Sequence, residues 1–133
     1  MKLSAQDLTG PAQVTMLPDY DVELSGCGGT VQFINGLYHI QKGILHGDRP
    51  TYKHESNVPP GFSTLSGRSV FLYFHPTNTT WTIAMDVGSL EVIAFGVGDV
   101  VSPNHVVGQW YTSEESEYKL NPKVQVRRAR AGS

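Results

Sequence analysis

The run Ser69-Val-Phe-Leu-Tyr-Phe74 and the run Thr80-Trp-Thr-Ile-Ala-Met85 decide the fold class. The first run is apolar on both faces of an extended chain, which predicts a central strand covered on both sides. In the second run Trp81, Ile83 and Met85 share one face, because side chains alternate along a strand. The intervening Pro76-Thr-Asn-Thr79 is rich in turn formers. Two neighbouring strands joined by a turn are therefore expected.

Shorter runs of the same kind lie on both sides of this pair. Residues 21–25 alternate polar and apolar side chains, with Val22 and Leu24 on one face, and residues 123–128 alternate in the same way and predict a last edge strand. Further strand candidates cover 37–42, 51–55, 90–95 and 106–111. Short strands at roughly ten-residue spacing, with turn residues between them, predict an all-β fold. We expect a small antiparallel sandwich or barrel of about seven or eight short strands.

One segment favours a helix instead. Thr112 stands three residues before Glu115, which is the spacing of a capping box. The glutamates that follow Thr112 would lie near the positive end of the helix dipole. The pattern predicts one short helix near 113–120 that buries little beyond Tyr118 and Leu120.

The chain length suits one domain, because 133 residues lie within the usual range for a single core. Residues 1–19 lack clear periodicity and contain two prolines, so we expect an N-terminal arm there. A single β domain is expected over 20–127, and 128–133 predicts a flexible tail. Residues 57–67 are rich in proline, glycine and serine and predict a long surface loop.

Composition narrows the function classes. A formal net charge of −2 gives no basic field for phosphates, so we expect no nucleic-acid partner. Cys27 is the single cysteine, which excludes an internal disulfide and a cysteine-based zinc cage. That count fits a reducing compartment, so an intracellular, cytoplasmic location is expected, with secretion left open. No window approaches 18 apolar residues, so no membrane span is expected.

A set of turn and aromatic residues has a recognisable spacing. It consists of Gly26, Asn35-Gly36-Leu37-Tyr38, Gly43, Gly47-Asp48-Arg49-Pro50-Thr51-Tyr52, Leu72-Tyr73-Phe74, Trp81-Thr82-Ile83, Ser102-Pro103 and Gly108-Gln109-Trp110. The spacing resembles a small all-β module of multidomain protist and algal proteins. The resemblance covers residues 24–111 and implies one complete β module. Asp48 between Gly47 and Arg49, and the long 55–68 loop, depart from the pattern.

Five residues of this set are candidates for ligand binding: Tyr38, Arg49, Tyr52, Tyr73 and Trp110. Aromatic faces can stack on a sugar or another small ligand. The structural interpretation is that the large rings build the core, and that Arg49 stacks on Tyr38, Tyr52, Trp81 or Trp110, or pairs with Asp48. We favour the structural interpretation.

No catalytic, metal or cofactor site is predicted. The five histidines, His39, His46, His54, His75 and His105, come one per segment, without the spacing of a metal site. Cys27 lies among glycines and lacks a local nucleophile signature. Asn78-Thr79-Thr80 matches a glycosylation acceptor, which matters only in a secreted chain.

Three functions remain open at this point. The favoured hypothesis is a non-catalytic interaction or structural module with a protein partner, for which strands near the chain ends could offer a sheet edge. The first alternative is a carbohydrate- or small-ligand-binding β domain. The second alternative is a small enzyme that uses histidine and aspartate with a metal ion.

Overall fold

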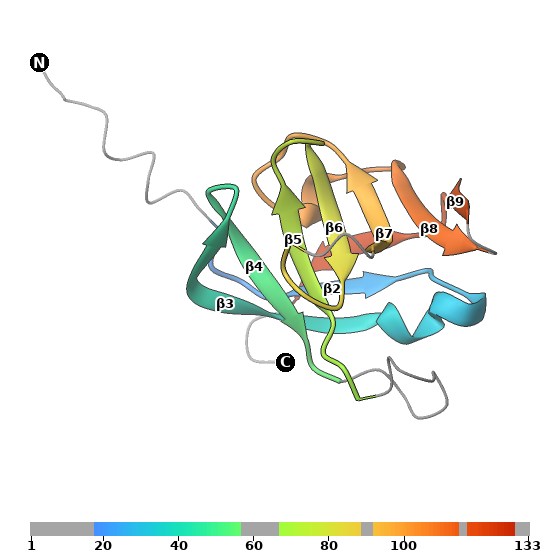
Figure 1. Cartoon of the computed structure of the whole chain (residues 1–133), viewed down its shortest axis with the longest axis horizontal. Helices are drawn as coiled ribbons and strands as arrows, with labels where there is room; N and C mark the ends of the chain where they lie inside the picture. Colours follow the sequence, from blue (N-terminus) through green and yellow to red (C-terminus); the bar gives the residue numbers. More distant parts are fainter. Residues whose placement is uncertain (1–17, 57–66, 89–91, 115–116, 130–133) are drawn as a thin grey trace, which may run out of the picture.

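The computed structural model describes residues 18–56, 67–88, 92–114 and 117–129. These residues form one antiparallel sheet of nine strands, curled into a half-barrel (Figure 1). The strands are β2 (Val22–Ser25), β3 (Gly36–His46), β4 (Arg49–His54), β5 (Phe71–His75), β6 (Thr80–Ala84), β7 (Val92–Val97), β8 (Trp110–Glu114), β9 (Glu117–Leu120) and β10 (Gln125–Arg128). Their order across the sheet is β10-β2-β3-β4-β5-β6-β7-β8-β9.

The all-β prediction is confirmed, with nine strands in one curled sheet rather than two packed sheets. The run 69–74 supplies β5, which is the middle strand of the order. Leu72, Tyr73 and Phe74 are all buried, as expected of a strand covered on both faces. The 123–128 run supplies β10 at one edge of the sheet, where it pairs with β2 from Val22↔Arg128 to Ser25↔Gln125.

The core fills the inside of the curl. Cross-strand partners share a face, so Phe74, Trp81, Gly96 and Trp110 form one row across β5 to β8. The largest fully buried side chains are Trp81, Trp110, Tyr38, Tyr52, Tyr73, Phe74, Leu24, Ile34, Leu72, Ile83, Val22 and Val70. Most of the aromatic rings named from the sequence are therefore used to hold the curl closed.

Two short 3-10 helices complete the described structure: η2 (Gly29–Ile34) and η4 (Pro103–His105). The segment that follows η2 explains the Asn35-Gly36-x-Tyr38 pattern. The Asn35 side chain exchanges two hydrogen bonds with the Cys27 backbone, at 3.0 and 2.8 Å. Gly36 has a φ of +126°, and the Tyr38 hydroxyl donates to the carbonyl of Ile34 at 2.6 Å. The pattern fastens the 25–29 loop to the start of β3.

The turn between β3 and β4 accommodates the extra Asp48. Gly47 and Asp48 both have positive φ, +60° and +62°, between the paired residues His46 and Arg49. This is the geometry of a two-residue hairpin turn, where glycine and aspartate are favoured. Asp48 therefore lengthens the motif without breaking the hairpin.

The helix predicted near 113–120 is wrong in the part that the structure describes. β8 extends to Glu114 and β9 begins at Glu117, and the two strands pair from Tyr111↔Leu120 to Glu114↔Glu117. Tyr118 and Leu120 lie on one face at strand spacing, and the Tyr118 ring packs on Phe95 of β7. This tertiary contact overrides the local capping pattern. Residues 115 and 116 lie outside the description.

Other sequence predictions fall partly or wholly outside the described residues. These are most of the arm at 1–19, the loop at 57–66, the start of the 90–95 strand and the last four residues of the tail. The 106–111 strand begins later than expected, at Trp110, because η4 and the positive φ of Gly108, +70°, occupy the preceding residues. Across the described ranges, no helix is long and apolar enough to cross a membrane.

Candidate binding surface

The four aromatic rings predicted from the sequence as ligand contacts are all buried. Tyr38, Tyr52, Tyr73 and Trp110 each have 0% of their surface exposed. Tyr38 contacts His54, and Tyr52 contacts Trp81. None of the four offers a ring face to a ligand in this structure.

Arg49 is the fifth predicted residue, and its contacts differ from those expected. Its guanidinium lies 3.7 Å from the centroid of the Phe74 ring and forms an ion pair with Asp99, rather than with Asp48 or one of the four rings named from the sequence. Its Nη1 also donates to the Gly47 carbonyl at 3.3 Å. Only 20% of the side chain is exposed. The Arg49 side chain thus ties β4 and β5 to the segment after β7.

The histidines are held by separate partners. His54 is buried, and its Nε2 donates to the Asn35 carbonyl at 2.7 Å while its Nδ1 accepts from the Ser56 N–H at 2.9 Å. His46 Nδ1 donates to the Phe74 carbonyl at 2.8 Å, and His39 contacts Asp21 at 2.9 Å. Among the residues that the structure describes, no three His, Cys, Asp or Glu side chains gather closely enough to hold a metal ion.

Cys27 lies inside the domain, where only 6% of its surface is exposed. Burial raises the pKa of its thiol to about 12. The thiolate is the nucleophilic form of cysteine, so this environment suppresses the reactivity of Cys27.

We therefore expect Cys27 to resist thiol reagents while the protein is folded. At pH 8 a pKa near 12 rather than 9.0 lowers the thiolate fraction about a thousandfold. Labelling with Ellman's reagent should be slow in buffer and fast in denaturing urea, with the unfolded chain as the internal control. Because the neutral thiol is favoured in the folded state, the free energy of unfolding should fall as the pH rises from about 9 toward 12. A rapid stoichiometric reaction of the folded protein would contradict the burial.

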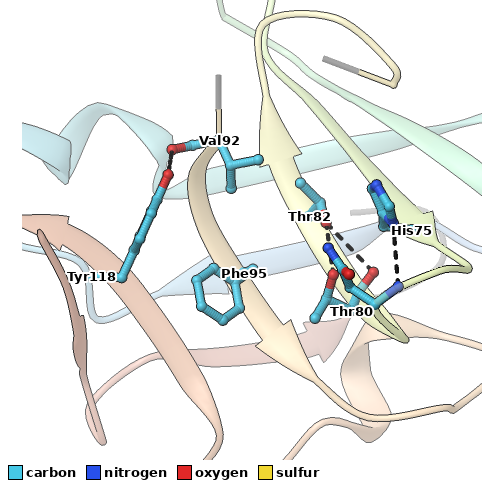
Figure 2. A pocket seen from close by; sticks show the side chains of 7 residues that line it. His75, Thr80, Thr82, Val92, Phe95 and Tyr118 are labelled. Carbon is cyan, nitrogen blue, oxygen red and sulfur yellow. Dashed lines mark hydrogen bonds between the residues drawn. The ribbon is translucent and has the colours of Figure 1, made fainter. Parts of the chain in front are cut away.

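The outer face of the sheet carries a different set of side chains. Register places Thr82 opposite Phe95, Phe95 opposite Tyr111 and Ser113 opposite Tyr118, so these residues share the face turned away from the core. A hollow of about 390 Å³ opens on this face (Figure 2). Its lining is His75, Asn78, Thr80, Thr82, Val92, Phe95 and Tyr118.

One wall of the hollow is apolar and held in place. The Phe95 and Tyr111 rings stack with centroids 5.0 Å apart, and Tyr118 meets Phe95 edge-on at 5.2 Å. The Tyr118 hydroxyl donates to the Val92 carbonyl at 2.6 Å, which fixes the ring across β8 and β7. Tyr118 is nevertheless 47% exposed. We call Phe95, Tyr111 and Tyr118 the outer aromatic cluster.

The opposite wall is polar and carries hydroxyl, amide and imidazole groups, with no carboxylate, ammonium or guanidinium group among its lining residues. The hydroxyls of Thr80 and Thr82 lie 3.2 Å apart, and Thr82 also donates to the Thr80 carbonyl. His75 Nδ1 accepts from the Asn78 N–H at 3.4 Å, so a neutral His75 ring carries its proton on Nε2. Figure 2 shows these groups on one side of Phe95 and Tyr118 on the other. The hollow can therefore take a group with one apolar and one hydrogen-bonding side.

Sequence reasoning missed this surface. The alternation of Thr80 and Thr82 with Trp81 and Ile83 was visible, and it assigned the threonines to the face opposite the core. The third ring was lost because Tyr118 was placed on a helix. Tyr118 and Phe95 lie 23 positions apart in the chain, and they meet only because β9 pairs with β8 and β8 pairs with β7. Composition and periodicity do not reveal a contact of this kind.

A second hollow of about 450 Å³ lies between η2 and the β8–β9 pair. Three glycines, Gly26, Gly28 and Gly29, form part of its lining, and Lys119 in its wall pairs with Glu114 at 3.2 Å. No aromatic ring lines it. This hollow therefore lacks the stacking surface found on the outer face.

No protein-family model, curated protein or solved structure matches this chain. The geometry of the described residues therefore carries the functional argument.

Proposed function

We propose that this domain is a non-catalytic interaction module that binds a protein segment on the outer face of β6, β7 and β9. The observation that supports the proposal is the outer aromatic cluster, which leaves ring surface open to solvent, whereas the rings of Tyr38, Tyr52, Tyr73, Phe74, Trp81 and Trp110 are buried. Aromatic residues in a pre-positioned, partly exposed cluster are typical anchors of protein interfaces.

The chemistry of the hollow suggests the kind of segment it takes. An apolar side chain would lie against Phe95 and Val92, and a backbone or amide group would meet Thr80, Thr82 and Asn78. The intracellular location and the absence of a nucleic-acid partner, both expected from the composition, belong to this proposal.

A carbohydrate is the second candidate ligand. The specific observation in its favour is the position of Phe95 and Tyr118 beside the hydroxyls of Thr80 and Thr82 and the Asn78 side chain. Sugars bind through such a pairing of a ring face with hydrogen-bonding groups. The buried rings Tyr38, Tyr52, Tyr73 and Trp110 take no part in either version.

Selection from a displayed peptide library, with a glycan array in parallel, tests the proposal. We expect peptides with an apolar anchor to be selected. The variant Phe95→Ala should weaken their binding by at least about tenfold, because truncating an anchor residue costs about 2 kcal/mol or more and about 1.4 kcal/mol corresponds to a factor of ten. Val97→Ala, on the same strand and face but outside the lining, is the matched control and should change the affinity less than about twofold.

A further variant addresses the polar wall. Thr82→Val keeps the volume and removes the hydroxyl, so it should weaken binding with the fold intact, as checked by circular dichroism. Selected peptides that bind Phe95→Ala as tightly as the unaltered protein would overturn the proposed surface. Binding to glycans alone would favour the carbohydrate.

A further inference from the structure

The two edges of the sheet differ in how they are covered. At one edge, β10 contacts η4, and its Val126 is buried. At the other edge, all four residues of β9 are exposed. An edge strand presents unpaired N–H and C=O groups that can pair with another strand. β9 is therefore the open edge of the described sheet.

The backbone groups that β9 offers can be read from the hydrogen-bond pattern. The Asn121 N–H donates to the Trp110 carbonyl at 2.8 Å. Trp110 and Asn121 are therefore a hydrogen-bonded pair of the antiparallel ladder between β8 and β9. Such pairs alternate, so Lys119 points its backbone groups at Thr112 of β8. The N–H and C=O groups of Tyr118 and Leu120 then point away from β8 toward the open edge.

Two glutamates, Glu114 of β8 and Glu117 of β9, lie beside a single lysine, Lys119 of β9. Glu117 lies directly opposite Glu114, and like charges in this position destabilise a strand pair. Lys119 is the one cation of β9, and it pairs with Glu114 at 3.2 Å. Glu117 has no ion pair among the described residues. A cation supplied from outside, opposite Glu117, would relieve this repulsion.

We propose that two copies of this chain associate through antiparallel pairing of β9 with β9. With the twofold axis at Tyr118, Glu117 faces Lys119 of the second copy, and Lys119 faces Glu117 of the second copy. Tyr118 meets its own counterpart and exchanges both outward hydrogen bonds with it. In this dimer each Glu117 faces a lysine of the other copy, and the sheet continues across the two molecules.

Neighbouring registers fit less well. A twofold axis at Lys119 would place the two lysines directly opposite each other, which is unfavourable. An axis at Leu120 would bring Pro122 opposite Tyr118, and proline has no N–H to donate. The Tyr118 register also sets Tyr118, which is 47% exposed on the outer face, against its own counterpart. A four-residue edge makes a small contact, so the dimer is weak and depends on concentration.

Sedimentation velocity over a range of protein concentrations tests the proposal. Lys119→Glu places four glutamates around the axis and should raise the dimer dissociation constant at least about tenfold. The double variant Glu117→Lys/Lys119→Glu restores opposite charges across the axis, so it should bring the constant back to within about threefold of the unaltered chain. Arg127→Glu inverts a charge on β10 at the other edge and should leave the constant unchanged.

The backbone contribution is tested at the axis itself. Tyr118→Ala keeps the outward N–H, and Tyr118→Pro removes it without removing a bond to β8. We expect the proline variant to dimerise more weakly than the alanine variant, with both folded by circular dichroism. Three results would each overturn the proposal. The chain could stay monomeric at every concentration, the dimer dissociation constant could be unchanged in the Lys119 variants, or the double variant could dimerise as weakly as Lys119→Glu. Because Glu117 and Lys119 do not line the outer-face hollow, the results with their variants are independent of peptide binding, whereas the Tyr118 variants also change the lining of the hollow.

Discussion

Replacing Gly26 with alanine should destabilise the domain more than any other single-methyl addition at a described glycine. The new Cβ would lie 2.0 Å from the Lys123 carbonyl oxygen and 2.9 Å from the Cα of Val124. These are backbone atoms, so rotating a side chain cannot relieve the clash. Gly26 also has a φ of +96°, where a residue with a Cβ is strained. Strain and overpacking together should cost about 2–5 kcal/mol.

Urea unfolding followed by circular dichroism measures this effect. Gly28→Ala is the matched control, because Gly28 has an extended backbone with a φ of −127° and nothing within 4 Å of an added Cβ. It should change the free energy of unfolding by no more than about 1 kcal/mol, with a small gain expected from the stiffer unfolded chain. Equal stability of the two variants would mean that the approach of the 25–29 loop to Lys123 is not as described.

Trp81→Ala should cause a loss of similar size, for a different reason. Trp81 is fully buried, with ring centroids 5.6 Å from Phe74 and 6.1 Å from Tyr52. Its Nε1 donates to the Val100 carbonyl at 3.0 Å. Removing a buried ring leaves a cavity, and such changes cost about 3–5 kcal/mol. Circular dichroism is again the readout, since the substitution removes one of the two tryptophans that fluorescence would report.

Two controls separate the contributions at Trp81. Trp81→Phe keeps an aromatic ring and loses the Nε1 hydrogen bond, so it should cost less than the alanine variant. Val97→Ala lies on the outer face, where the side chain is 42% exposed, and should cost less than about 0.5 kcal/mol. A Trp81→Ala protein as stable as Val97→Ala would show that the core is not centred on β6.

The sequence was sufficient to predict the all-β class and the middle strand, because both depend on local alternation. Leu72 and Phe74 face the core with Trp81 and Ile83, as period-two patterns require. The edge strand at β10 was predicted for the same reason. A local pattern also caused the error at 113–120, where the capping box of Thr112 and Glu115 was outweighed by the packing of Tyr118 on Phe95.

The binding surface could not be derived from the sequence in the same way. It depends on register, which brings β6, β7 and β9 together on one face. Aromatic content alone pointed to Tyr38, Tyr52, Tyr73 and Trp110, which are the rings that pack best and so are buried. The partner of Arg49 was missed for a related reason, because Asp99 lies fifty residues away in the chain and Asp48 is its neighbour.

The pairing of β2 with β10 places the first and the last of the described strands in chain order next to each other. The Ala129 N–H donates to the Asp21 carbonyl at 2.8 Å, and adjacent strands are separated by about 5 Å. A polypeptide that leads into β2 and continues after β10 therefore leaves the domain beside the point where it arrives. Such a unit can be spliced into a surface turn of a larger host without forcing the host's own segments apart, and its ends can be rejoined by a short linker to give a circular permutant.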